Sequence, residues 1–476
     1  MSFDTDIKPT EKSLAGNNNN SGKLSLKEKI GFSVGDTASN LFFQTFVNFL
    51  LFFYTDVFGL APAVAGTMFL VTRIWDAIND PIMGAIADRT QTSIGKFRPY
   101  IKWFAIPFGV IGFFMFITPD FAETGKIVYA YVTYTLMMMI YTVINVPYSA
   151  LMGVISPNSL ERTEVSSFRF VAAYVGLLIV TSLTQTLVDF FGNGNEQVGW
   201  QWAIACFAVL SIILWFITFK TTKERVEPPK DQQANFKRDG KDLFLNKPWL
   251  LIAGATVFQL TYIVVKSSVQ PYYIKYYVQD HSMSLFGMNI ELSLSYFLTS
   301  GAIATLVGAI MTKWFVKRFD KKIAYGGFLG LSAVLCTFFF FLSPTDVVLI
   351  YLVNIVSSFL FGPVSVLQWA MYTDTADYGE WKFGRRATGL IMAASLFALK
   401  LGVAIGGAIT GWVLASYGFE ANQIQTAESI KGILVLFGIY TATFGVLGAL
   451  LIIFYPLTNK MMKNIEGDLV LRRQEV

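Results

Sequence analysis

Apolar stretches long enough to cross a membrane recur along the whole chain, separated by short polar segments. A helix needs about 20 apolar residues to span the hydrocarbon core of a bilayer. Hydropathy divides the chain into about twelve such stretches, which predicts an all-α polytopic membrane protein. The predicted spans are residues 28–54, 62–87, 99–118, 126–154, 166–190, 200–220, 248–277, 289–315, 322–343, 346–371, 387–416 and 432–455.

Charge in the loops predicts the orientation of these spans. Loops after even-numbered spans carry clusters of lysine and arginine, such as Lys96 and Arg98 after span two, or Lys317 and Arg318 after span eight. Loops after odd-numbered spans carry few cations. Because basic loops stay in the cytoplasm, we expect both termini to be cytoplasmic, in a protein integral to the bacterial cytoplasmic (inner) membrane.

A long polar connector divides the chain into two halves with six predicted spans each. "GAIADR" at 84–89 ends span two and "GAIMTK" at 308–313 ends span eight, with the same spacing from glycine to cation. This echo indicates an internal duplication of the kind found in two-bundle transporters. The expected domains are a disordered cytoplasmic tail at 1–24, an N-terminal six-helix bundle at 25–220, a cytoplasmic connector at 221–247, a C-terminal six-helix bundle at 248–456 and a cytoplasmic C-terminal tail at 457–476.

Composition argues against several classes of function. Charged residues are 14% of the chain and hydrophobic residues 54%, which is too apolar for a soluble protein. The net charge of +5 is small and the cations lie in short loops, so nucleic acid is not an expected partner. His281 is the only histidine and falls in a loop, so we expect neither enzymatic activity nor a resident cofactor. Cys206 and Cys336 lie in apolar stretches and are expected to be core thiols.

Several charges interrupt span two, in "VTRIWDAINDPIMG" at 71–84. Asp76, Asn79 and Asp80 stand at i, i+3 and i+4, so their side chains share one helix face, which Arg73 joins. Ionised groups facing lipid are costly, so this face should point inward. Its oxygen ligands suit a small hard cation, Na⁺ or else H⁺. In the alternative interpretation Arg73 neutralises one aspartate and the group only locks helices together, but one arginine leaves a surplus negative charge.

Other predicted spans contain polar residues that follow the same logic. Arg169 lies near the expected start of its span, where its charge can reach the interface. Lys266 and Lys400 lie too deep for that, and the alternative for Lys266 is a packing lysine paired with a carboxylate. The set is Asp36 and Asn40 in span one, Thr142 and Asn145 in span four, Arg169 in span five, Lys266 in span seven and Lys400 in span eleven.

Four segments together resemble a known family. They are "RIWDAINDPIMG", "GKFRPY" downstream of it, "ERTEVSSFRF" after span four and "DTADYGEWKFGRRATG" after span ten. They resemble the glycoside–pentoside–hexuronide:cation symporters, a branch of the major facilitator superfamily whose best-known member is melibiose permease. The resemblance covers residues 28–455. It implies two pseudo-symmetric six-helix bundles around a central sugar cavity, working by alternating access.

The resemblance also implies site residues. The cation site corresponds to Asp76, Asn79, Asp80 and Thr142. The sugar contacts correspond to Ser39, Asn40, Asn145, Ser149, Arg169 and Lys400 with Tyr141 beside them, and Asp36, Lys266 and Trp369 complete the expected substrate site. Asn40 and Asn145 stand where melibiose permease has aspartates, and Ser149 and Ser365 replace its tryptophans, so galactosides are not expected. Trp369, one turn after Ser365, could supply a stacking surface instead.

Charged residues near the expected cytoplasmic ends of the spans should form a charge network and gate contacts. The basic loops after spans two, four, eight and ten lie on the same side as several acidic residues, so pairs between these loops and the acidic residues can form cytoplasmic gate contacts. The expected set is Arg73, Asp88, Arg89, Glu161, Arg162, Glu380 and Arg386, with Glu164 as a further acidic partner.

A count of intramembrane charges predicts the class of substrate. Three anions (Asp36, Asp76 and Asp80) face four cations (Arg73, Arg169, Lys266 and Lys400), and a bound Na⁺ would raise the surplus further. Unpaired buried cations are costly, so a substrate with its own carboxylate is the simplest compensation. We therefore expect a monomeric Na⁺ symporter for an acidic sugar, either a hexuronide or a short uronic-acid oligosaccharide.

Three alternatives remain open at this stage. If Lys266 or Lys400 pairs with Asp36, a neutral xyloside or glucoside becomes the expected substrate. Buried carboxylates have raised pKa values in general, so H⁺ can replace Na⁺ as the coupling ion. A lysolipid carrier of the same fold is the third alternative, against which the polar cavity residues argue. An ion channel is less expected, because the chain lacks rings of like residues.

Overall fold

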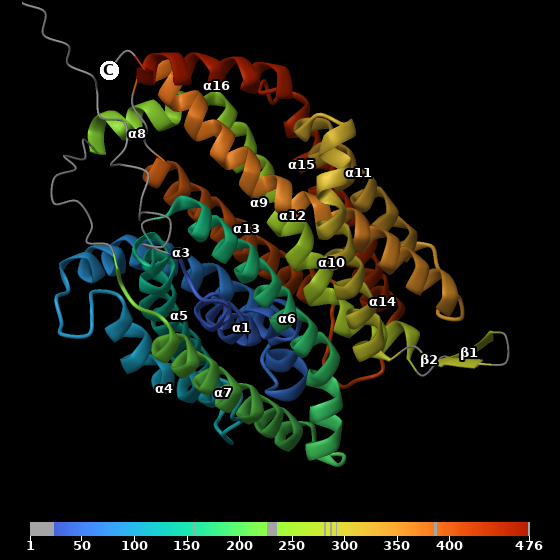
Figure 1. Cartoon of the computed structure of the whole chain (residues 1–476). Coiled ribbons are helices and arrows are strands. Elements are labelled where there is room, and N and C mark those ends of the chain that lie inside the picture. The colour runs from blue at the N-terminus through green and yellow to red at the C-terminus, as the bar shows by residue number, and fades with distance from the viewer. Residues whose placement is uncertain are drawn as a thin grey trace, which may run out of the picture.

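The computed structural model describes residues 23–156, 158–225, 236–279, 282–285, 288–291, 293–384 and 388–474. Within these ranges the chain is almost entirely helical (Figure 1). The exception is an antiparallel hairpin of β1 (Ser282–Leu285) and β2 (Met288–Glu291), in which Ser282 pairs with Glu291. The expected all-α fold is therefore confirmed.

The described part of the N-terminal half contains six long helical segments. The first runs from α1 through α2 into the π-helical turn η1 with an interruption at Phe49, and proline at the first turn begins α3 and α4, where its missing N–H costs no hydrogen bond. The elements are α1 (Leu26–Asn48), α2 (Leu50–Phe52), η1 (Phe53–Val57), α3 (Pro62–Arg89), α4 (Arg98–Phe114), α5 (Glu123–Val154), α6 (Ser159–Gly192) and α7 (Glu196–Thr221).

The C-terminal half repeats this arrangement and adds a short helix before it and another after it. Its elements are α8 (Phe236–Leu245), α9 (Lys247–Tyr272), η2 (Tyr273–Val278), α10 (Leu294–Arg318), α11 (Lys321–Cys336), η3 (Thr337–Phe340), α12 (Val347–Phe383), α13 (Thr388–Ser416), α14 (Ala427–Leu434), η4 (Val435–Tyr440), α15 (Thr441–Ile453) and α16 (Asn459–Gln474). Among the described residues, nine helical segments are long and apolar enough to cross a membrane. The count of twelve spans stays a prediction.

Several predicted boundaries were wrong. Span eight was expected from residue 289, but 288–291 form strand β2, and span ten was expected to end at 371 although α12 continues to Phe383. Helix α8 lies inside the expected polar connector and α16 inside the expected C-terminal tail. Hydropathy misses α8, α16 and the end of α12 because these segments are amphipathic or charged, and hydropathy detects only uniformly apolar helices.

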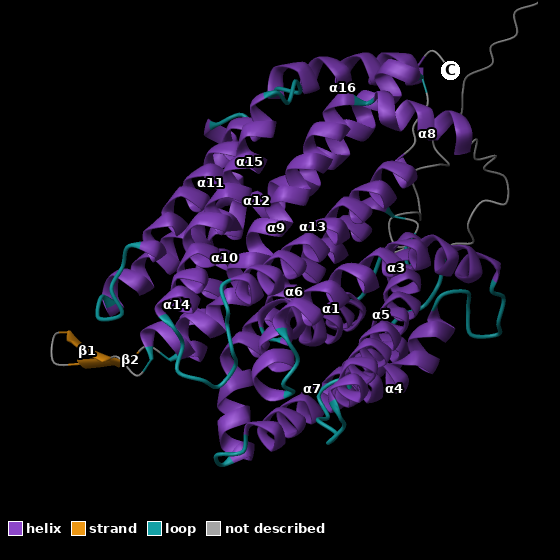
Figure 2. Ribbon diagram, turned by 180° about the vertical axis from the view of Figure 1, so that it is seen from behind, coloured by secondary structure: helices purple, strands orange, loops and turns teal. Residues whose placement is uncertain are grey.

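The two halves pack through two equivalent pairs of helices, α3 with α13 and α6 with α10 (Figure 2). Glycines allow α3 and α13 to approach closely: a Cβ on Gly411 would lie 2.4 Å from the carbonyl oxygen of Pro62. The indole of Trp412 donates to Thr67 Oγ1 at 3.0 Å in the same region. This packing brings the middle of α13 against the charged face of α3.

The two ends of the molecule differ. The starts of α1 and α9, together with α8 and α16, lie at one end, which we call the terminal side (Figure 1). The β1–β2 hairpin and the ends of η1 and η2 lie at the opposite end, the hairpin side. Leu24, expected in a disordered tail, is buried at the terminal side and donates its N–H to Glu161 at 3.1 Å.

Candidate functional site

Two aspartates of α3 meet one threonine of α5 in the middle of the N-terminal half. Asp76 is 1% exposed, and its Oδ1 accepts from the hydroxyl of Thr142 at 2.8 Å. Oδ1 of Asp80 is 2.9 Å from the same hydroxyl. Asn79 is half-buried on the same helix. The structure therefore brings together three of the four residues expected at the cation site, the two aspartates of the shared helix face and the threonine that the family resemblance added.

The ammonium of Lys400, on α13, lies against both of these carboxylates. It is 2.9 Å from Oδ2 of Asp76 and also forms an ion pair with Asp80. Nη1 of Arg73 lies 3.8 Å from Oδ2 of Asp76. Two cations thus face two carboxylates, so the surplus negative charge expected from Arg73 alone was wrong. The α3–α13 contact directs Lys400 to the acid pair in this conformation, and its expected role as a sugar contact stays a prediction.

A second buried ion pair joins α1 to α6. Arg169 binds Asp36 through two bonds, Nε to Oδ2 at 2.7 Å and Nη2 to Oδ1 at 3.0 Å, and Tyr148 donates to Oδ2 at 2.6 Å. Because α6 begins at Ser159, Arg169 lies well inside the helix, and the expectation that it sits near a helix end was wrong. Asp36 therefore pairs with Arg169, and not with Lys266 or Lys400 as the alternative for a neutral sugar assumed.

A cavity of about 450 Å³ lies between the two halves, within the range of roughly 300–1,000 Å³ that is typical of small-molecule sites. Asn40, Lys266 and Trp369, all expected at the substrate site, line it. The other expected residues do not belong to this lining: Asp36, Ser39, Tyr141, Asn145, Ser149, Arg169 and Lys400. Two of them satisfy each other, since Ser39 donates to Asn145 at 2.6 Å.

Sequence reasoning missed much of the polar lining. These residues are amides and hydroxyls placed singly in apolar stretches, as Asn354 is in "LIYLVNIVSSF", and they were overlooked because only charged residues and family positions were considered. They are Gln44, Asn48, Tyr174, Thr181, Gln259, Gln270, Asn354, Ser358 and Gln368. The Nε2 of Gln368 is buried without a hydrogen-bond partner among the described residues.

Lys266 is the one charged residue in the described lining of this cavity. It is 3% exposed, and its ammonium donates to Ser357 at 2.9 Å and to Ser358 at 3.1 Å. No carboxylate pairs with Lys266 in the described part of the chain. The described residues therefore do not form the alternative arrangement, in which a carboxylate holds Lys266 for packing.

The expected gate residues at the terminal side pair within one half. Glu161 lies 2.8 Å and Glu164 2.6 Å from Lys29 of α1. The hydrogen bond from Lys29, followed by that from the N–H of Leu24, lowers the pKa of Glu161. Arg162 donates to the carbonyl of Ser156 at 2.8 Å.

In this conformation Glu161 and Glu164 therefore pair with Lys29 of α1 and not with a basic loop, and their role as gate contacts stays a prediction. Arg73 belongs to the buried acid pair instead of to an end of the molecule. Arg89 is exposed and Glu380 is half-buried. The side chain of Asp88 and the whole of Arg386 lie outside the described residues.

Residues 31–459 match the family model described as MFS/sugar transport protein. The chain belongs to this family of membrane transporters. It is 36% identical to YagG of Escherichia coli K12, whose name assigns it provisionally as a glycoside/cation symporter, over 95% of this chain and 96% of that one. It is 33% identical to an isoprimeverose transporter of Lactiplantibacillus pentosus (92% and 91% covered) and 31% identical to a glucuronide carrier protein homolog of E. coli K12 (95% and 97% covered).

The fold agrees with this membership. The E. coli xylose transporter XylE in its inward-open form matches 93% of this chain and 98% of its own, with a TM-score of 0.62 and 15% identity. That likeness shows the major facilitator fold. Family and relatives together identify a transporter of the inner membrane that takes sugars or glycosides with a cation.

Proposed function

We propose that the chain is a Na⁺-coupled symporter of an acidic sugar, a hexuronide or a short uronic-acid oligosaccharide. The observation that carries the proposal is the distribution of the buried cations. Arg169 is paired with Asp36, while Arg73 and Lys400 lie against Asp76 and Asp80. Among the described residues, Lys266 is the one cation left in the cavity lining, and its ammonium is held by serine hydroxyls.

The acid pair offers oxygen ligands of the kind that would suit Na⁺. The oxygens of Asp76, Asp80 and Thr142 are hard donors within one small space, and the buried Oδ2 of Asp76 faces the ammonium of Lys400 at 2.9 Å. Lys400 now supplies the positive charge there. Na⁺ would bind by replacing the ammonium, one monovalent charge for another, so the local charge balance would be unchanged.

Replacement of Lys400 would couple the ion to the sugar. Leu399 and Val403, its neighbours on α13, line the cavity, so a released Lys400 lies at the edge of the substrate site. Two cations, Lys266 and Lys400, would then lack a carboxylate. A substrate carboxylate would compensate them, so that each ligand raises the affinity for the other. The amides of the lining would bind sugar hydroxyls, and Trp369 would stack on a sugar ring.

A second candidate has independent support. One relative is named an isoprimeverose transporter, and isoprimeverose is a sugar without an acid group. Its likeness to this chain favours a neutral glycoside such as a xyloside, with Na⁺ or H⁺ as the coupling ion. A glucuronide carrier homolog at similar identity favours the acidic sugar. A lysolipid is less favoured, because amides and hydroxyls from both halves line the cavity.

Uptake into membrane vesicles distinguishes these substrates. A radiolabelled uronide and its matched neutral glycoside are compared under a Na⁺ gradient and under a pH gradient alone, in the wild type and in Lys266→Gln. We expect the Na⁺ gradient to drive uptake of the uronide. We expect Lys266→Gln to lower apparent uronide affinity by about 10- to 100-fold, the range for a hydrogen bond to a charged group, with little change for the neutral sugar.

Lys431→Gln, an exposed lysine of α14, is the matched control. Uptake driven only by the pH gradient would replace Na⁺ with H⁺ in the proposal. Equal uptake of both sugars, with a ratio that Lys266→Gln does not change, would favour the neutral glycoside.

A further inference from the structure

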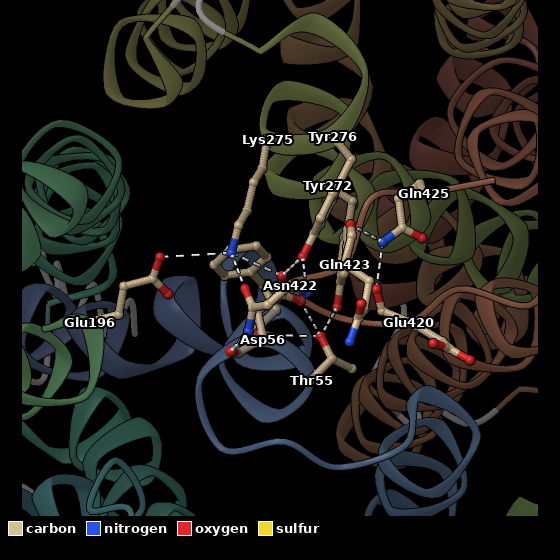
Figure 3. A network of polar contacts seen from close by, with 11 residues as sticks. Thr55, Asp56, Glu196, Tyr272, Lys275, Tyr276, Glu420, Asn422, Gln423 and Gln425 are labelled. Carbon is tan, nitrogen blue, oxygen red and sulfur yellow. Dashed lines mark hydrogen bonds and ion pairs between the residues drawn. The ribbon is translucent and has the colours of Figure 1, made fainter. Parts of the chain in front are cut away.

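A polar network closes the hairpin side between the two halves (Figure 3). At its centre is Asp56 of η1, whose side chain is 0% exposed. Lys275 of η2 donates to Oδ1 of Asp56 at 3.1 Å, and the hydroxyl of Tyr276 donates to the same oxygen. Thr55 donates to Oδ2 at 2.7 Å. A carboxylate of the N-terminal half is therefore enclosed mainly by donors of the C-terminal half.

The loop between α13 and α14 adds a second layer of contacts through Asn422. Its Nδ2 donates to the carbonyl of Asp56 at 2.6 Å and its N–H to the hydroxyl of Tyr276 at 2.9 Å, while its Oδ1 accepts from Lys275 at 2.8 Å. Asn422 has a φ of +58°, a left-handed conformation that asparagine tolerates better than most residues. One side chain thus binds backbone and side-chain groups of both halves.

Aromatic rings pack against the residues of this network. Phe419 makes edge contacts with the rings of Tyr272 and Tyr276, at centroid distances of 5.2 and 5.1 Å. Lys275 lies 4.9 Å from the ring centroid of Phe52, and the hydroxyl of Tyr272 is 2.7 Å from Thr55 Oγ1. Figure 3 shows Glu196 at the edge of the network, 3.7 Å from Lys275.

The terminal side is held differently. The described ion pairs there join residues of one half, as in Lys29 with Glu161, Arg225 with Glu28, and Lys321 with Asp374. At the hairpin side, by contrast, the ion pairs of Lys275 with Asp56 and with Glu196 both cross between the halves. These crossing contacts indicate a conformation closed at the hairpin side.

We propose that Asp56, Lys275, Tyr276 and Asn422 form an outer latch that holds the cavity closed at the hairpin side and must break for the substrate to enter. The inference rests on the proposed transport function for its meaning, but its test reads closure alone. The latch is local to the ends of η1 and η2 and to the loop between α13 and α14, so it is separate from the acid pair and from the cavity.

The charge of Asp56 sets the behaviour of the latch. A buried ion pair contributes little net stability, but removal of one partner leaves an uncompensated buried charge and is strongly destabilising. Lys275→Gln would leave Asp56 in that condition in the closed form, whereas water would solvate it in the open form. The equilibrium should therefore shift towards opening at the hairpin side. Asp56→Asn together with Lys275→Gln removes both charges and should restore closure.

Labelling of a cysteine in the cavity measures this equilibrium. Ala173→Cys places a thiol in the cavity lining, away from the latch, and a membrane-impermeant maleimide is applied to vesicles from the hairpin side. We expect Lys275→Gln to label at least about threefold faster than the parent with Ala173→Cys. We expect the double variant to return close to the rate of that parent.

Two controls accompany this measurement. Lys431→Gln removes an exposed lysine on the same side and should label as the parent does. The same variants without Ala173→Cys report on the native Cys206 and Cys336, of which Cys336 is buried and reacts only if the fold is lost.

An unchanged rate in Lys275→Gln, or a double variant that labels as fast as Lys275→Gln, would overturn the latch. Reaction of Cys336 would overturn it too, since opening would then reflect general unfolding. Neither readout needs substrate or Na⁺, so failure of the latch and failure of the proposed symport remain distinguishable.

Discussion

At the scale of single residues, the notable feature is an ammonium group in the candidate cation site. Lys400 reaches the acid pair from the other half of the molecule, so its charge contributes to the contact between the halves. An internal cation of this kind competes with a bound ion for the same oxygens. Binding of Na⁺ would therefore have a structural consequence, because it loosens one contact between α3 and α13.

Lys400→Gln tests this competition. We expect the variant to bind Na⁺ at least as tightly as the wild type, because the competitor is gone, while Na⁺ no longer raises substrate affinity by the wild-type factor, which for coupled sites is typically ~5- to 150-fold. Calorimetric titration with Na⁺ and equilibrium binding of the labelled uronide measure the two quantities. Loss of Na⁺ binding, or coupling of wild-type size, would contradict competition by Lys400.

At the scale of elements, helix α16 shows how a segment outside the predicted spans completes the fold. Met462, Ile465 and Leu469 are buried at i, i+3 and i+7, so one face of α16 packs against the protein. Beside α12, Asp468 accepts from the indole of Trp381 at 2.9 Å. These contacts cover the extension of α12 that hydropathy did not predict.

Ile465→Ala should destabilise this packing. Truncation of a buried isoleucine costs about 2–5 kcal/mol, so we expect a clear decrease in the apparent melting temperature of the purified protein. Glu466→Ala, the exposed neighbour, should change stability by about 0.5 kcal/mol or less. Thermal unfolding of the protein in detergent compares the two variants, and an equal effect of both would show that α16 does not pack in solution as described.

At the scale of the whole molecule, the two halves touch along α3–α13 and α6–α10 and are latched at one end. A rocking motion about these contacts would open the hairpin side as the latch breaks. The face of the membrane at which the latch lies then depends on which side is cytoplasmic. The basic loops predict that the terminal side is cytoplasmic.

Single cysteines test this orientation. Glu123→Cys, at the start of α5, lies at the hairpin side, and Lys463→Cys, on α16, lies at the terminal side; both positions are exposed. We expect an impermeant maleimide to label the first from outside intact cells and the second only in inverted vesicles. The parent chain reports the background from its native cysteines. Labelling of both positions from the same side would refute the orientation.

Much of the architecture was predictable because hydropathy and helical spacing are local properties. Asp76 and Asp80 share a face of α3 whatever surrounds them, since i and i+4 always do in a helix. Boundaries were less predictable, since α12 continues to Phe383 through charged residues that tertiary contacts stabilise, among them the packing against α16 and the ion pair of Asp374 with Lys321. Gln259 and Gln368 escaped notice because a single amide in an apolar stretch carries no periodic signal.

The sequence by itself determined that this chain is helical, membrane-embedded and duplicated, and which helices carry intramembrane charge. Only the tertiary structure decided which charges pair: Arg169 with Asp36, Lys400 with the acid pair, Lys275 with Asp56, and no carboxylate with Lys266 among the described residues. The reason is physical. Burial of a charge depends on its own helix, whereas its partner depends on which other helix packs there, and close contacts such as that of Gly411 with Pro62 set that packing far along the chain.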